Sequence, residues 1–270
     1  MRISVIISTY NNPDWLEKVL WAYAVQTVRD FDVIVADDGS TAETKERIDA
    51  MRQVTGLAIQ HVWHEDQGFR KCTILNKAIV AAETDYLLFT DGDCIPRWDF
   101  VEAHLRFARP GCYLSGGAYR LPLDVSTAIT AEDIRSHAVF NARWLLRAGT
   151  PFDPRIIKFH LSGWMALFCA RLTTTRPTFN GGNASVWRED IIRVNGFDER
   201  MQYGGQDREL GQRLENAGIH PLQIRYYAQC LHLDHGRGYR TPEALALNWQ
   251  IRRETRESGS TWTPYGITRE

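Results

Sequence analysis

The chain has 270 residues, of which 44% are hydrophobic and 24% charged, as in a globular protein with one large α/β domain or a domain with a subdomain. The formal net charge of -1 gives no electrostatic reason to expect a nucleic-acid partner. The five cysteines form no CxxC pair and no zinc-binding spacing, which favours a reducing compartment. No segment has the roughly 18 consecutive apolar residues that span a bilayer, and the start lacks a signal-peptide pattern, so we expect a cytoplasmic protein.

The first 91 residues alternate short apolar runs with segments of helical periodicity. Strands are expected over residues 3–8, 31–36, 57–62 and 86–90, and helices are expected after Pro13, Thr41 and Gly68. This alternation predicts an α/β fold with a Rossmann-like, mostly parallel central sheet and helices on both faces. Ligands in such sheets bind at the carboxyl ends of the strands, which is where this sequence places its polar clusters.

The second half of the chain is less regular. Helices are expected over residues 98–108, 130–148, 188–194 and 208–217, and strands over residues 112–118, 184–187 and 223–233. The stretch 149–158 holds two prolines and predicts a mobile loop, and the polar segment from residue 254 predicts a poorly ordered tail. Arg252, Arg253 and Arg256 fit either a peripheral membrane contact or, as the favoured interpretation, a solvated helix face.

Two carboxylates follow the strand at 86–90. Asp91 and Asp93 are separated by one glycine, so both can face one divalent cation and its ligand. Hard oxygen ligands suit Mg²⁺ or Mn²⁺ bound to a diphosphate, and such a cation stabilises a departing nucleoside diphosphate. A polar turn is the alternative interpretation of the tripeptide alone.

Further polar groups stand at strand ends and helix starts. Asp37 and Asp38 could accept the imide N–H of uracil or bond a ribose hydroxyl, although a turn and helix cap is the favoured interpretation of this cluster taken alone. Arg70 and Lys71 open a helix after a glycine, an arrangement that favours phosphate but also fits a solvated basic turn.

The second half supplies a candidate base and two candidate metal ligands. Asp207 stands at a helix start, where the helix dipole keeps a carboxylate ionised and suited to act as a general base, and it also fits an N-cap. Glu209 lies close enough that only one of the two carboxylates is the base. His232 and His235 flank Asp234 at the end of the last strand, and one of them could complete a metal site.

Six runs in this order resemble glycosyltransferase family 2: VIISTYNNPDWLEKVL, VIVADDGS, LLFTDGDC, FNGGNASVWREDIIRVNGFDE, YGGQDRELGQRL and LHLDHGR. They are most similar to the branch whose carboxyl-terminal region is shared with β-1,4-galactosyltransferases and chondroitin polymerase. The resemblance covers residues 1–110 and 179–238, and it implies the GT-A fold and sugar transfer from a nucleotide donor.

The resemblance implies roles for individual residues. It places a loop along the nucleoside, a carboxylate pair near uracil, a basic group near the diphosphate, and a region that shapes the donor-sugar and acceptor pocket. It also implies a metal pair with a third, histidine ligand, and a catalytic base. These positions are, in order, Thr9 and Tyr10; Asp37 and Asp38; Arg70; Gly182, Asn183 and Trp187; Asp91 and Asp93 with His232 (alternatively His235); and Asp207.

One position departs from the family pattern. Gln206 replaces the acidic residue that precedes the base, so the donor sugar is expected to differ from that of the most similar relatives. We expect a nucleotide-sugar-binding half over 1–110, a variable acceptor-recognition insert over 111–178, a catalytic and acceptor half over 179–240, and a C-terminal helix and tail over 241–270.

The sequence therefore predicts an inverting glycosyltransferase that uses Mn²⁺ or Mg²⁺. It would move a hexose or N-acetylhexosamine from a UDP-sugar to a hydroxyl of a glycan or glycolipid acceptor, in the synthesis of bacterial surface polysaccharide or lipopolysaccharide. A binding module without turnover and a nucleotidyltransferase are the rival interpretations. The latter would need a glycine-rich basic loop where Thr9, Tyr10, Asn11 and Asn12 stand. The residues do not indicate an oligomeric state.

Overall fold

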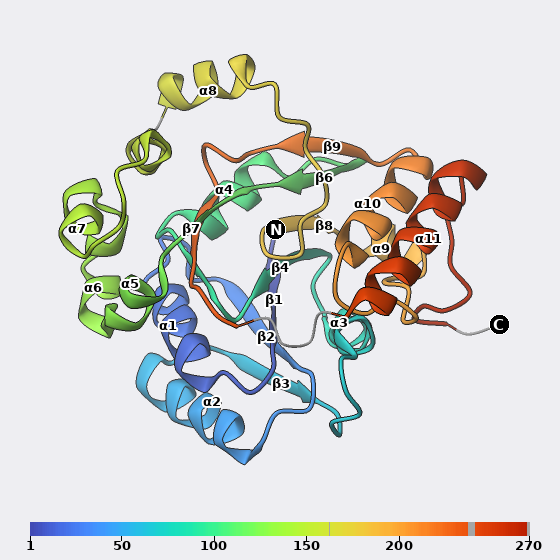
Figure 1. Ribbon diagram of the computed structural model, residues 1–270, viewed down its shortest axis with the longest axis horizontal. Coiled ribbons are helices and arrows are strands. Elements are labelled where there is room, and N and C mark those ends of the chain that lie inside the picture. The colour runs from blue at the N-terminus through green and yellow to red at the C-terminus, as the bar shows by residue number, and fades with distance from the viewer. Residues whose placement is uncertain (162, 237–240, 269–270) are drawn as a thin grey trace.

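A computed structural model shows a protein built on a seven-stranded sheet, with strand order β3-β2-β1-β4-β8-β6-β9 (Figure 1). The structure describes residues 1–161, 163–236 and 241–268. The sheet is mostly parallel, and buried apolar clusters lie on both of its faces. The predicted α/β fold with a Rossmann-like sheet is confirmed.

The first half of the chain forms the parallel part of the sheet. All seven residues of β1 are buried, because this strand lies between β2 and β4 with helices over both faces. In the register, Thr9 pairs with Asp37 and Ser8 pairs with Asp91, so the polar carboxyl ends of these strands lie side by side. The strands are β1 (Ile3–Thr9), β2 (Phe31–Asp37), β3 (Ile59–Trp63) and β4 (Tyr86–Asp91), and the helices are α1 (Pro13–Ala24), α2 (Ala42–Thr55) and α3 (Lys71–Ala81).

The second half extends the sheet and adds a smaller one. In the large sheet, β8 runs antiparallel to both β4 and β6, and β9 runs parallel to β6. The small sheet has the order β5-β10-β7 and pairs His232 with Cys94, next to the Asp91–Asp93 turn. The strands are β5 (Cys94–Pro96), β6 (Cys112–Ser115), β7 (Gly117–Arg120), β8 (Ala184–Trp187), β9 (His220–Gln223) and β10 (Gln229–His232), with helices α4 (Phe100–Phe107), α9 (Arg188–Arg193), α10 (Gln206–Asn216) and α11 (Pro242–Ser258).

Two predicted strands are each divided in the structure. The expected strand 112–118 becomes β6 and β7, which lie in different sheets because the chain bends at Gly116. A side chain at Gly116 would collide with Asn183, since an added Cβ would lie 2.0 Å from its Oδ1. The expected strand 223–233 is broken by a turn in which the Ala228 amide donates to the carbonyl of Ile224.

The segment between β7 and β8 is an insert of short helices that line one side of the molecule (Figure 1). The predicted loop 149–158 is partly wrong, because residues from 154 onward form a 3₁₀ helix. The Asp153 side chain begins this helix by accepting a hydrogen bond from the Arg155 amide. The insert contains α5 (Leu123–Ala128), α6 (Ala131–Arg135), η1 (Ala138–Phe140), α7 (Ala142–Arg147), η2 (Pro154–His160) and α8 (Gly163–Leu172).

The C-terminal segment packs on the body, so the predicted poor order of the tail is wrong for the described residues. α11 buries Ile251 and Thr255 against α10. Beyond α11, the Asn195 side-chain amide donates to the carbonyls of Thr263 and Thr268, at 2.7 Å in each case. These hydrogen bonds are long-range contacts, which a locally polar sequence does not indicate.

Candidate active site

A cavity of about 920 Å³ opens at the carboxyl ends of β1 and β4, where the strand order reverses. Its wall is completed by the starts of α3 and α10, the end of β10 and one side of α11. Ligands in open α/β sheets bind at this place. The predicted site residues that line it are Thr9, Tyr10, Asp38, Asp91, Asp93, Gly182, Asp207, His232 and His235.

Three predicted residues lie outside the cavity lining. Asp37 is buried behind it, where its carboxylate contacts His61 Nε2 at 2.8 Å and accepts from the Ser40 amide. The Arg70 side chain turns to Gln67, and only its backbone amide reaches the site by donating to Asp38. Trp187 lies at the opposite end of the strands, beside the first residue of β4, because β8 is antiparallel to β4.

Asn183, a fourth predicted residue, is buried behind the cavity wall rather than exposed in it. Its Nδ2 donates to the carbonyls of Gly117 and Ala228, at 2.9 and 3.2 Å. Its Oδ1 therefore faces His104 Nε2 at 3.0 Å, and this ring nitrogen must carry the proton. His104 Nδ1 then accepts from Ser185 Oγ at 2.8 Å. Asn183 thus joins the large sheet to the small one and fixes their relative position.

Burial lowers the pKa of His104 to about 3, and the hydrogen bond to Asn183 only partly opposes this effect. In the unfolded chain the pKa of a histidine is near 6.5. Below that pH His104 is therefore protonated in the unfolded chain but remains neutral in the folded protein. We expect acidification from pH 7 to pH 5 to remove about 2 kcal/mol of unfolding free energy through His104. Denaturant unfolding of wild type and His104→Gln measures this as a difference in pH slope. The exposed His220, changed to Gln, is the matched control, and equal slopes for wild type and His104→Gln would contradict the expectation.

Asp91 is held by two neighbours at the cavity floor. Its Oδ1 accepts from Ser8 Oγ at 2.7 Å and from Lys71 Nζ at 2.6 Å. Burial would lower the pKa of Lys71, but the adjacent Asp91 carboxylate raises it well above its usual range, so the ammonium stays charged. Lys71 begins α3, so a permanent cation and the amino end of a helix face the same cavity.

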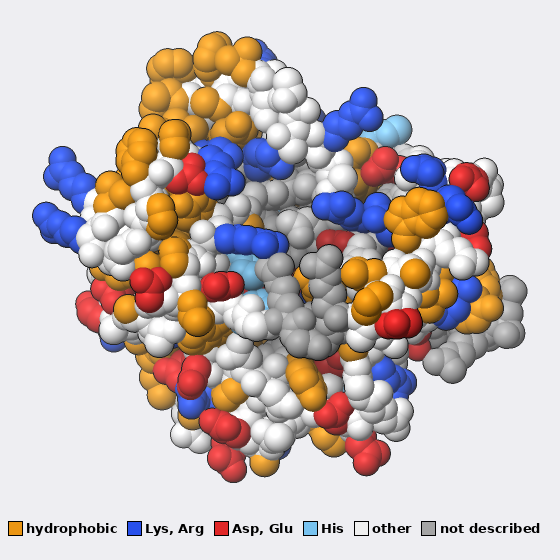
Figure 2. Space-filling view, viewed as in Figure 1, with side chains coloured by type: hydrophobic (Ala, Val, Ile, Leu, Met, Phe, Trp, Pro, Cys, Tyr) orange, Lys and Arg blue, Asp and Glu red, His pale blue; other side chains and the backbone are white. Residues whose placement is uncertain are grey.

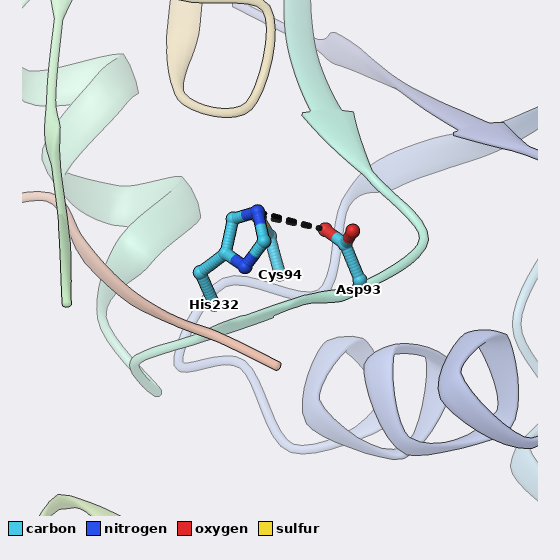
Figure 3. A group of neighbouring side chains, drawn as sticks. All are labelled: Asp93, Cys94 and His232. Atoms are coloured by element: carbon cyan, nitrogen blue, oxygen red, sulfur yellow. Dashed lines mark hydrogen bonds and ion pairs between the residues drawn. The ribbon is translucent and has the colours of Figure 1, made fainter. Parts of the chain in front are cut away.

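Asp93 lies between two imidazole rings. Its Oδ2 is 2.9 Å from His235 Nε2, and its Oδ1 is 3.8 Å from His232 Nε2. The two rings stack with their centroids 5.7 Å apart. Figure 3 shows His232 and Asp93 pointing toward one another, with Cys94 beside them. Asp93, Cys94 and His232 bring potential metal-ligating atoms within 4.8 Å of one another. The structure therefore places both alternative histidines at the same carboxylate, with His235 the nearer.

The backbone fixes the tautomer of each ring. His232 Nδ1 faces the carbonyl of Leu233 and His235 Nδ1 faces that of Gly236, at 2.8 Å in each case. A carbonyl only accepts, so each Nδ1 must donate, and in a neutral imidazole Nε2 then carries a lone pair. Both lone pairs face the Asp93 carboxylate, which is also electron-rich. Among the described residues, two lone pairs and a carboxylate thus face one another, an arrangement that protons or a bound cation would stabilise.

The two candidate bases have different surroundings. Asp207 lines the cavity at the start of α10, where its oxygens accept from the backbone amides of Gly181 and Arg208. Glu209 is 1% exposed and forms two hydrogen bonds with Arg213, each 2.8 Å long. Thr255 also donates to Glu209. Glu209 is therefore occupied in the interior, and Asp207 is the carboxylate that an incoming ligand can reach.

The C-terminal helix adds cavity residues that sequence analysis did not assign to the site. Trp249 and Arg252 of α11 line the cavity, although Arg252 was interpreted as part of a surface cluster. A Trp and an Arg at helical spacing gave no local signal of this role. Lys71, grouped with Arg70 as a phosphate-binding pair, is the member of that pair that reaches the cavity. Arg237, which ends the last motif, lies outside the described residues.

Sequence comparison identifies two family regions in the chain. Residues 4–168 match the family described as glycosyl transferase family 2, and residues 169–236 match the N-terminal domain of galactosyltransferase. Chondroitin synthase of Escherichia coli is 26% identical over 226 residues, which cover 81% of this chain and 33% of that protein. Validoxylamine A glucosyltransferase of Streptomyces hygroscopicus subsp. jinggangensis is 29% identical over 239 residues, with 82% and 53% covered. The chain thus spans between a third and about half of these relatives.

Solved structures show the same fold. A mannosyltransferase from Pyrobaculum calidifontis in complex with GDP-Man and Mn²⁺ matches with a TM-score of 0.60 and 22% identity, covering 95% of this chain and 61% of that one. GalNAc-T7 with UDP, GalNAc and Mn²⁺ matches with a TM-score of 0.64 and 16% identity, covering 94% and 48%. Both are glycosyltransferases, and the predicted GT-A fold is confirmed. With the family match over more than half of its length, the chain belongs to glycosyl transferase family 2.

Proposed function

We propose that the protein is a metal-dependent inverting glycosyltransferase that moves a hexose or N-acetylhexosamine from a UDP-sugar to a hydroxyl of a glycan acceptor. The observation that carries the proposal is one cavity that holds both the electron-rich Asp93–histidine cluster and the accessible Asp207 carboxylate. The first suits a cation and its diphosphate, and the second suits an acceptor hydroxyl. Because chondroitin synthase of Escherichia coli is among its relatives, we propose a role in bacterial polysaccharide synthesis.

We propose that the Asp93–histidine cluster holds Mn²⁺ or Mg²⁺. Two ligands at right angles around an octahedral ion, with bonds of about 2.1 Å, lie about 3 Å apart. The Asp93–His235 separation of 2.9 Å matches that spacing, and the Asp93–His232 separation of 3.8 Å is wider. A bound cation would supply charge neutralisation for the departing nucleoside diphosphate. Lys71 adds a fixed positive charge at Asp91, the other carboxylate of the Asp91–Asp93 turn.

Asp38 is the group that we propose for nucleoside recognition. It lines the cavity, and its two oxygens accept from the Arg70 amide at 2.9 Å and contact His64 Nε2 at 2.7 Å. Each carboxylate oxygen has a further lone pair, so Asp38 can still accept the imide N–H of uracil. Burial raises the pKa of Asp38, and the contacts with His64 and Arg70 oppose this effect. These contacts also hold the carboxylate in a fixed orientation.

Asp207 is the proposed general base. Among the carboxylates that line the cavity in the described part of the chain, Asp38, Asp91 and Asp93 each contact a lysine or a histidine, whereas Asp207 contacts backbone amides. Asp207 is therefore the carboxylate best suited to take the acceptor proton as the acceptor oxygen attacks the anomeric carbon. The bond to the nucleoside diphosphate breaks on the opposite face, so a single displacement inverts the configuration.

Thermal unfolding against UDP, GDP, CMP and dTDP, each with and without Mn²⁺, tests the donor. A ligand that binds the folded state stabilises it by about 2.7 kcal/mol at a hundred times its Kd. We expect the melting temperature to rise with UDP only when Mn²⁺ is present. A rise with GDP or dTDP alone would contradict the choice of donor, and a rise that ignores Mn²⁺ would contradict the metal site. Release of UDP from a UDP-sugar would then separate a transferase from a binding module.

A further inference from the structure

The helix α8 projects from the body of the molecule and exposes its apolar side chains (Figure 1). Trp164 is 76% exposed, Phe168 is 56% exposed and Leu172 is 65% exposed. Only one of the ten residues of α8, Arg171, is charged. A helix whose apolar side chains face water is stabilised when another apolar phase covers it. The described part of the fold leaves these side chains without such cover.

The exposed surface continues onto the preceding part of the insert. Phe152 is 80% exposed, and Ile157 and Leu146 are also exposed. Figure 2 shows hydrophobic side chains gathered over this part of the molecule, with Lys and Arg side chains next to them. We call this surface the insert patch. It consists of Leu146, Phe152, Ile157, Trp164, Met165, Leu167, Phe168 and Leu172.

The charges around the insert patch have one sign. Residues 141–178 contain six Lys or Arg and a single carboxylate, Asp153, in a chain that otherwise has more acidic than basic residues. Asp153 is already paired with Arg155 at 2.6 Å. Four exposed arginines remain that pair with no carboxylate of the described residues: Arg143, Arg147, Arg171 and Arg176.

We propose that the insert patch docks on the surface of an anionic phospholipid bilayer. Apolar and aromatic side chains bordered by unpaired arginines match the apolar boundary and the negative headgroups of such a surface. A helix of ten residues is about 15 Å long, half of what crosses the hydrocarbon core, so α8 lies in the interface. No helix in the described part of the chain is long and apolar enough to span a membrane.

The same charges disfavour a second copy of the chain as the occupant. Two insert patches placed face to face would bring the unpaired arginines of both copies together, and like charges across an interface are costly. An anionic bilayer instead offers negative charge over its whole area. The charge pattern therefore favours a lipid surface over a second copy of the chain as the occupant of the insert patch.

The insert that carries the patch is attached to the body beside the cavity. The insert leaves the body after Arg120 and rejoins it before Asn180, and both residues line the cavity. If the proposed function holds, docking would hold an acceptor carried on a lipid near the end of the insert that adjoins the cavity. The docking itself follows from exposure and charge, so it stands without the proposed function.

Cosedimentation with vesicles of phosphatidylcholine, with and without phosphatidylglycerol, tests the docking. We expect the full chain to bind the anionic vesicles and to be released by high salt. The double variants Trp164→Ser/Phe168→Ser and Arg171→Gln/Arg176→Gln should each bind at least about tenfold more weakly. The matched controls are Val54→Ser, exposed on α2, and Arg253→Gln/Arg256→Gln, exposed on α11, and both should bind like wild type.

Several outcomes would overturn the proposal. One is that wild type binds neither kind of vesicle, or binds neutral vesicles as strongly as anionic ones. Another is a concentration-dependent dimer that the Trp164→Ser/Phe168→Ser variant abolishes, since a second copy would then cover the insert patch. Unchanged melting temperatures establish that the variants are folded. The assay does not measure sugar transfer, so its result is independent of the donor experiment.

Discussion

Replacing Asp207 by Asn is expected to lower kcat about 10² to 10⁴-fold, the usual contribution of a general base, while leaving binding of UDP and Mn²⁺ unchanged. Asp207 accepts from the Arg208 amide through Oδ1 and from the Gly181 amide through Oδ2. Asn keeps one acceptor oxygen for these amides but cannot take a proton at neutral pH. The variant therefore loses the proton transfer and one of the two hydrogen bonds to backbone amides, and its melting temperature checks that the fold is retained. The measurement is turnover of UDP-sugar, with thermal unfolding as the check on nucleotide binding.

Glu209→Gln is the control that distinguishes the two carboxylates. Glu209 is paired with the buried Arg213, and removing one partner of a buried ion pair costs about 3 to 5 kcal/mol of stability. We expect Glu209→Gln to lower the melting temperature while its folded fraction keeps its kcat. If Asp207→Asn turns over like wild type with intact nucleotide binding, Asp207 is not the base. Retention of the α-configuration in a product from a UDP-α-sugar would contradict the inverting mechanism.

Local sequence patterns were sufficient to predict the strand ends that build the cavity floor. Asp38, Asp91 and Asp93 each follow a buried apolar run, and parallel strands must bring their carboxyl ends to one edge. Asp207 was predicted in the same way from two glycines before a helical pattern. The structure brings these residues to one cavity, and each position depends on a few consecutive residues at a strand end or a helix start.

Predictions failed where the outcome depends on residues distant in the chain. Trp187 was expected in the pocket, but β8 runs antiparallel to β4 and places this residue at the far end of the strands. Asn183 bonds with Gly117, Ala228 and His104, contacts that no local pattern predicts. Trp249 and Arg252 line the cavity only because α11 folds back on α10. Strand direction and helix docking are set by the whole core, so the polar pattern of one segment does not reveal them.

The largest effect on metal binding is expected from Asp93→Ala. Asp93 is the carboxylate that both His232 and His235 face, so its loss removes the negative charge that draws a cation between them. We expect the rise in melting temperature with UDP and Mn²⁺ to disappear, and turnover to fall at least about 10³-fold, equivalent to several kcal/mol of lost charge stabilisation.

Asp234→Asn is the matched control for that experiment. Asp234 lies between the same two histidines in sequence, but it is exposed and does not line the cavity. Its variant should bind UDP and Mn²⁺ like wild type. Comparing His232→Gln with His235→Gln then assigns the imidazole ligand: the ligand's variant needs more Mn²⁺ for half-maximal turnover, whereas the other variant does not. If Asp93→Ala keeps the Mn²⁺-dependent response to UDP, the cation binds elsewhere, and the electron-rich cluster would have to hold protons in its place.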